Sequence, residues 1–219
     1  VGHAAGENIT TGDDNIAIGM VALQQMTTGS RNIAIGSSAL LNTYGDAGDA
    51  PASIDNIAIG YNCMSGNWAD DEDSNYNTGI GSYVLDGAMD AATYNTGIGY
   101  NSLSAVTTGD SNVGIGAQTG TALVTGERNT FLGTSAGNVS TDVDKTVFIG
   151  YNAGGGADIT SAGDGTVGIG YSTLINLTSG AGNVAVGAYA LDAATTDDYC
   201  TAIGYQALSG VTGDNNNHN

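Results

Sequence analysis

The chain has 219 residues, of which 36 are Gly and one is Pro, and its 22 acidic residues outnumber 3 basic ones to give a formal net charge of −19. This charge excludes nucleic acid as a partner, because phosphate binding depends on Lys and Arg. The 41% apolar content argues against disorder, and no run approaches the ~18 apolar residues of a membrane span, so we expect no membrane insertion.

A five-residue motif, Asn-Ile-Ala-Ile-Gly, starts at Asn15 and recurs in looser form almost to the end of the chain. Its last residue, which we call the coil glycine, recurs in steps of 17, 24, 21, 18, 17, 17, 17, 20, 17 and 17 residues. A repeat of this regularity predicts an all-β fold, a parallel β-solenoid or β-roll of about eleven 17-residue coils. Residues 1–219 then form one repetitive β-roll. Because the chain starts with Val-Gly and lacks an initiator Met, we expect it to be a fragment of a longer chain.

Each motif predicts a short strand just before its coil glycine, beginning with residues 16–18, 33–35 and 57–59. The first and third residues of these strands are β-branched or aliphatic and share one face. We expect this face, with Ile18, Ile35 and Ile59, to form the structural core. The middle residue is Ala or Gly in nine of the eleven coils, and we expect this small row to face a neighbouring chain.

The two exceptions in the small row are Phe131 and Phe148, in adjacent coils. Four residues after the coil glycine most coils have Leu or Met, but three coils that include these two have Gly, at Gly120, Gly137 and Gly154. A large residue in one row thus accompanies a small residue in the other, as close packing requires. We therefore also place Phe131 and Phe148 in the core.

An Asn opens the motif in eight coils, which predicts a ladder of side-chain amides that hold successive coils in register. A plain turn-forming role is the alternative. All three basic residues, Arg31, Arg128 and Lys145, stand one position earlier, in a row that also contains Asp14 and Asp55. Ion pairs between coils are therefore expected in this row.

Insertion loops are expected at residues 42–53, 65–74 and 155–163, where the repeat is lengthened. Insertions in solenoids often carry binding, and the first two hold the only Pro and the only Trp. An exposed aromatic ring beside carboxylates suits a sugar; the alternative interpretation is solvated loops that the scaffold tolerates. The candidate contacts for a receptor or glycan are Tyr44, Asp46, Asp49, Trp68, Asp70, Asp71, Glu72 and Asp73. Asp70, Asp71 and Asp73 are also a weak Ca²⁺ candidate; otherwise we expect no metal.

No catalytic constellation is evident, and we expect neither an enzyme nor a cofactor. The sequence lacks a Gly-Lys-Ser/Thr phosphate loop and a Cys cluster for zinc. Its two His residues, His3 and His218, lie near the two ends, which disfavours an acyltransferase of the hexapeptide-repeat type. Ice binding by a Thr ladder is disfavoured because few coils carry the Thr pair. Cys63 and Cys200 are eight coils apart, so we expect two buried thiols rather than a disulfide.

The repeated Ala-Ile-Gly unit, with its preceding Asn and following Gly-containing turn, resembles the repeats of the β-roll in the heads of trimeric autotransporter adhesins. Similar Asn-Ile-Ala-Ile-Gly repeats occur in bacteriophage tail fibres. This resemblance covers the chain from Gly2 to Leu208 and implies a left-handed roll that forms a homotrimeric fibre. The period of 17 is longer than that of the adhesin repeats.

Three functions follow from this resemblance. The favoured hypothesis is a structural segment of a phage tail fibre in the virion, involved in attachment to a host cell-surface glycan or protein. The first alternative is the head of a bacterial trimeric adhesin on the cell surface. The second is a glycan-cleaving tailspike, in which two carboxylates act as acid and base.

Overall fold

The computed structural model describes residues 1–42, 53–68 and 73–212, and within them the chain is an all-β parallel solenoid, as predicted. A short strand of three residues precedes each of eleven coil glycines. The strands are β1 (Ile16–Ile18), β2 (Ile33–Ile35), β3 (Ile57–Ile59), β4 (Thr78–Ile80), β5 (Thr96–Ile98), β6 (Val113–Ile115), β7 (Thr130–Leu132), β8 (Val147–Ile149), β9 (Val167–Ile169), β10 (Val184–Val186) and β11 (Thr201–Ile203). One 3-10 helix, η1 (Ser161–Gly163), is the helical element of the described residues.

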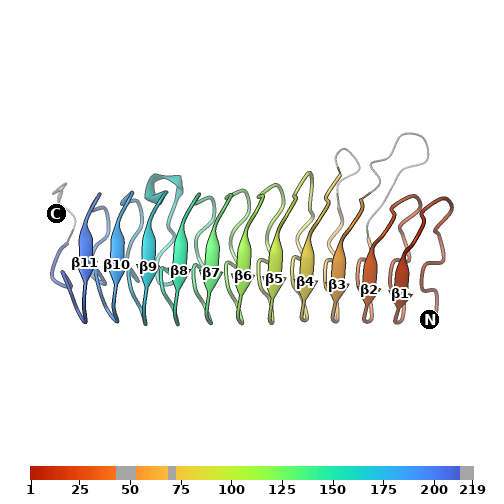
Figure 1. The fold of residues 1–219 in the computed structure, drawn as a ribbon, viewed down its shortest axis with the longest axis horizontal. Helices are drawn as coiled ribbons and strands as arrows, with labels where there is room; N and C mark the ends of the chain where they lie inside the picture. The colour runs from red at the N-terminus through yellow and green to blue at the C-terminus, as the bar shows by residue number, and fades with distance from the viewer. Residues whose placement is uncertain (43–52, 69–72, 213–219) are drawn as a thin grey trace. The chain divides into compact units, whose positions relative to one another are not determined.

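The chain divides into two compact units, Val1–Ser111 and Asn112–Asn219. The first contains β1–β5 and the second contains β6–β11, and in each unit the strands lie side by side in chain order (Figure 1). Neighbouring strands pair in parallel with equivalent residues opposite one another, for example Ile16 with Ile33 and Val184 with Thr201. The predicted insertion at 155–163 contains η1, whereas residues 43–52 and 69–72 of the other two insertions lie outside the described residues.

The coil glycines are required by both conformation and space. Gly36 has φ of 138° and Gly60 has φ of 143°, a region that L side chains rarely adopt. A Cβ on Gly36 would also collide with the carbonyl group of Gly60 in the next coil. The glycine row therefore lets successive coils stack closely as the chain turns away from each strand.

The structure buries the opposite face of the strands from the one predicted. The middle residues of the strands point inward: Ala34 and Ala58 are fully buried, and a Cβ on Gly79 would meet the side chains of Cys63 and Met64. The expectation that this small row faces another chain is therefore wrong. Its residues are small because the Leu or Met four positions after the coil glycine fills the coil from the opposite side.

The placement of Ile18, Ile35 and Ile59 in the core is also wrong. Ile18 is 43% exposed, and Ile35 and Ile59 are of intermediate exposure. Side chains alternate between the two faces of a strand, so burial of the middle residue turns its two neighbours outward.

Phe131 and Phe148 are fully buried, which confirms that part of the predicted core. Their rings stack with centroids 5.7 Å apart and an angle of 12° between the planes. A Cβ on Gly137 would lie 2.9 Å from the Phe131 ring, and one on Gly154 would collide with the Phe148 ring. A Phe in the strand therefore accompanies a Gly four residues after the coil glycine because the two positions share one volume inside the coil.

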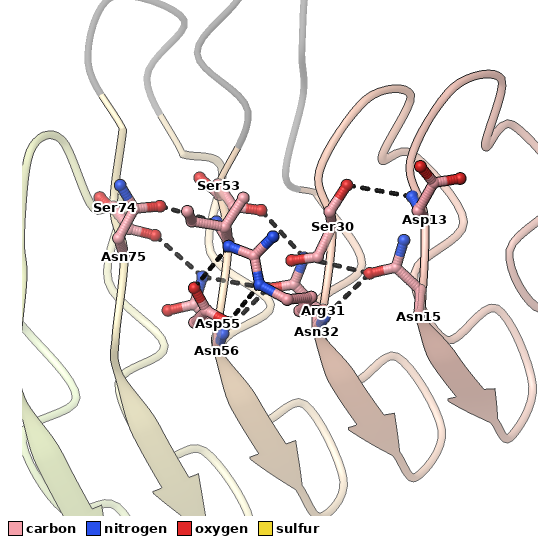
Figure 2. A network of polar contacts seen from close by, with 11 residues as sticks. Asp13, Asn15, Ser30, Arg31, Asn32, Ser53, Asp55, Asn56, Ser74 and Asn75 are labelled. Atoms are coloured by element: carbon pink, nitrogen blue, oxygen red, sulfur yellow. Dashed lines mark hydrogen bonds and ion pairs between the residues drawn. The ribbon is translucent and has the colours of Figure 1, made fainter.

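The row of Asn side chains forms the predicted ladder (Figure 2). The backbone N–H of Asn32 donates to Oδ1 of Asn15 at 2.9 Å, and that of Asn56 donates to Oδ1 of Asn32 at 3.0 Å. The amide Nδ2 of Asn32 also donates to the carbonyl of Ser53 at 2.9 Å. Asn32 and Asn56 are fully buried, so each side chain satisfies backbone groups that have no access to water.

Candidate interaction surface

The outward residues of the strands form an exposed apolar surface, which we call the strand face. In each unit it consists of the first and third residues of every strand, and none of these residues is buried. The first-residue row is Ile, Val or Thr and the third-residue row is Ile, Leu or Val, so the strand face has no charge. Although the chain has 22 acidic residues, none of them is on the strand face. The strand face is therefore suited to contact with another apolar surface.

Charged residues stand two positions before five of the strands, at Asp14, Arg31, Asp55, Arg128 and Lys145. Nε and one terminal guanidinium nitrogen of Arg31 donate to the two carboxylate oxygens of Asp55 at 2.8 and 2.7 Å, which confirms an ion pair between coils (Figure 2). This hydrogen-bonded guanidinium lowers the pKa of Asp55. Both groups are open to solvent, so the pair mainly orders the coil edge and contributes little stability.

Two tyrosine ladders follow the strands, just after the coil glycines. The first ladder is Tyr61, Tyr83 and Tyr100 in the first unit, with ring centroids 5.5 and 6.0 Å apart and both pairs edge to face at 84°. Tyr61 is 49% exposed and Tyr100 is 55% exposed. Desolvation, and then the phenol of Tyr61, raise the pKa of Tyr83.

The second ladder belongs to the second unit and consists of Tyr151, Tyr171, Tyr189 and Tyr205. Tyr151 and Tyr171 are stacked at 5.3 Å, whereas Tyr171 and Tyr189 meet at 65° and Tyr189 and Tyr205 at 84°. Desolvation, and then the phenol of Tyr171, raise the pKa of Tyr189. Tyr189, the third of these four rings, thus has an environment similar to that of Tyr83 in the first ladder.

The loop residues proposed from the sequence are only partly described. Tyr44, Asp46, Asp49, Asp70, Asp71 and Glu72 lie outside the described residues. Trp68 is only 3% exposed, so the prediction of an exposed Trp that stacks on a sugar is wrong. Its backbone N–H donates to the carbonyl of Asn42 at 3.2 Å, which holds this part of the chain against the preceding coil.

For the Ca²⁺ candidate, two of its three residues, Asp70 and Asp71, lie outside the described residues, and Asp73 is half-buried. Within residues 1–42, 53–68 and 73–212, no three His, Cys, Asp or Glu residues group as metal ligands. The same residues contain no helix with the length and hydropathy of a membrane span.

Both cysteines are free and buried, as predicted. Burial raises the pKa of the Cys63 thiol to about 12, which keeps it protonated and unreactive at neutral pH. Cys63 is thus a packing residue, next to the space that Gly79 leaves in the following coil.

Comparisons with known proteins give no match to a protein-family model, to a curated protein or to a solved structure.

The tyrosine ladders were not recognised from the sequence, although a signal exists. In coils that have Tyr directly after the coil glycine, as at Tyr61 and Tyr100, the next residue is polar. In two coils a small residue comes first, and Tyr is displaced by one position to Tyr83 or Tyr189. This displacement places the rings of Tyr83 and Tyr189 edge to face against their neighbours.

Proposed function

We propose that this chain is a structural segment of a phage tail fibre, located in the virion, that takes part in attachment to a host surface. We further propose that three copies associate about a common axis through their strand faces. The observation that carries the proposal is the exposed, uncharged strand face of each unit. Apolar surface of this kind, repeated on coil after coil, is stabilised when another apolar surface covers it.

The number three and the left-handed sense of the roll come from the resemblance to adhesin heads and tail fibres. In identical parallel copies, equivalent coils lie at equal height, so an Ile or Val row meets the same row of a neighbour. The β-branched side chains of these rows have few rotamers to lose on association. A fibre assembled in this way would be stiff, because every coil contributes backbone hydrogen bonds to the next.

The test is the mass of the chain in native solution, by sedimentation equilibrium and native mass spectrometry. We expect a mass three times 21.7 kDa. Ile35→Asp places a charge on the strand face and should give a monomer that retains its circular dichroism spectrum. The control is Asp13→Ala, since Asp13 is an exposed loop residue outside the strand face. A wild-type monomer would refute the assembly, and a dimer would refute the trimer.

The adhesin head and the glycan-cleaving tailspike stay alternative predictions. The adhesin head would use the same strand face, and the sequence that flanks this segment in its full-length chain distinguishes it: a coiled coil leading to a membrane anchor indicates an adhesin, and a virion-attachment domain indicates a tail fibre. Release of reducing ends from host polysaccharide is the test for the tailspike.

A further inference from the structure

In each tyrosine ladder, the coil with the displaced Tyr carries an Asp that the other coils of the ladder lack. The segments are Ser-Tyr-Val-Leu-Asp, ending at Asp86, and Ala-Tyr-Ala-Leu-Asp, ending at Asp192. In both, the Asp stands five residues after the coil glycine, a position that is acidic elsewhere only at Glu7, five residues after Gly2. The displaced Tyr and this Asp therefore occur together, once in each unit.

The two members of each pair lie three residues apart in the same coil. Desolvation is the main cause of the raised pKa of Tyr83 and of Tyr189, and the charge of Asp86 or Asp192, respectively, is the smallest contribution. Oδ1 of Asp86 accepts a hydrogen bond from the Ser65 hydroxyl at 2.6 Å, which orients the carboxylate. Each ladder thus combines half-exposed aromatic rings with a neighbouring carboxylate.

Primary amides border the ladders. The residues that follow Tyr61 and Tyr100 are Asn62 and Asn101, and those that follow Tyr151 and Tyr205 are Asn152 and Gln206. An amide both donates and accepts hydrogen bonds, and a carboxylate accepts them. The three basic residues stand on the other side of the strands, two positions before them. The ladders therefore offer apolar rings, neutral hydrogen-bonding groups and negative charge, with no cation for an anionic ligand.

We propose that each tyrosine ladder, with the Asp in the coil of its displaced Tyr, binds a neutral polysaccharide that runs along the row of coils. The rings pack on the apolar C–H faces of the sugars, and the amides and the carboxylate pair with their hydroxyl groups. The net charge of −19 repels acidic polysaccharides. This inference rests on the proposed function, since it names the class of receptor that the fibre would contact.

The test is affinity electrophoresis in native gels that contain hydroxyethyl cellulose, dextran, galactomannan or, as an anionic comparison, alginate. We expect retardation of the wild-type chain by at least one neutral polymer and none by alginate. Tyr83→Ala combined with Tyr189→Ala removes one internal ring from each ladder. This variant should bind roughly tenfold more weakly, as expected for the loss of several aromatic contacts.

The matched control is Tyr76→Ala combined with Tyr94→Ala. These two rings stack at 5.0 Å outside the ladders, in the row before the strands, so their removal should leave retardation unchanged.

Because Tyr83 is only partly exposed, Tyr83→Phe with Tyr189→Phe provides a second variant that keeps the packing and removes the hydroxyls. It should weaken binding less than the Ala pair, and Asp86→Asn with Asp192→Asn should weaken it without loss of the fold.

Two results would overturn the inference: no retardation in any of the neutral polymers, or equal retardation of the wild type and the Tyr83→Ala, Tyr189→Ala variant. A variant that loses its native oligomeric mass would show instead that the ladders are contacts between chains, which also overturns it. These outcomes are separate from a failure of the proposed function. A wild-type monomer that is retarded by a neutral polymer refutes the trimeric fibre and supports the ladders.

Discussion

The packing of Phe131 against Gly137 allows a quantitative test of how the coil interior is filled. Phe131→Ala removes a fully buried ring that stacks on Phe148, and loss of a buried aromatic side chain costs about 3–5 kcal/mol of unfolding free energy. Gly137→Leu introduces a side chain whose Cβ would lie 2.9 Å from the ring, and overpacking of this kind costs about 1–3 kcal/mol.

The two changes together should largely cancel. The double variant has Ala in the strand and Leu four residues after the coil glycine, the combination found in the second coil at Ala34 and Leu40. Leu40 has φ of 49° and Gly137 has φ of 57°, so the coil already holds a Leu in this backbone conformation. If the single effects were independent they would sum to about 4–8 kcal/mol. We expect the double variant to lose less than about 2 kcal/mol, because the volume is restored.

Urea unfolding followed by circular dichroism measures all three variants, and the difference from additivity is the coupling free energy. Gly210→Leu is the control, because a Cβ there meets no atom within 4 Å, and it should leave stability unchanged. Additive losses in the double variant would refute the argument that the strand residue and the later Gly share one volume.

Three further predictions concern buried and charged groups. Asn32→Ala leaves the buried N–H of Asn56 without its acceptor, so we expect a loss of about 1–3 kcal/mol in urea unfolding; Asn32→Thr should lose less, and equal losses would contradict a role for the side-chain acceptor. Arg31 lowers the pKa of Asp55, so the stability from this pair is present above the ordinary carboxyl pKa and fades as pH falls through the lowered value; an NMR titration should find that Arg31→Gln raises the pKa of Asp55, and no change would contradict the pairing. Cys63, with a pKa of about 12, should react with iodoacetamide at pH 8 only after unfolding, whereas rapid alkylation of the native chain would contradict its burial.

The sequence predicted the strands and their register from one observation, the spacing of the coil glycines. Parallel coils of nearly constant length place equivalent residues above one another, so the Asn ladder and the relation between Phe131 and Gly137 followed from the rows. The insertions were equally visible as interruptions of the spacing. The candidate contacts inside them depended on which side chains are exposed, and for Trp68 that expectation was wrong.

The sequence by itself determined the period, the rows and the alternation of side chains along each strand, because these depend only on the order of residues and on backbone geometry. Only the tertiary structure decided which side of the strand lies inside the coil. From the sequence alone, either the Ile row or the Ala row could point into the coil. The Ile row would need a wide interior and the Ala row a narrow one, so the volume that the coil encloses decides which row is buried. Most coils are filled by a Leu or Met from the opposite side, so only a small strand residue fits inward there, and the Ile rows and the Tyr rings remain outside.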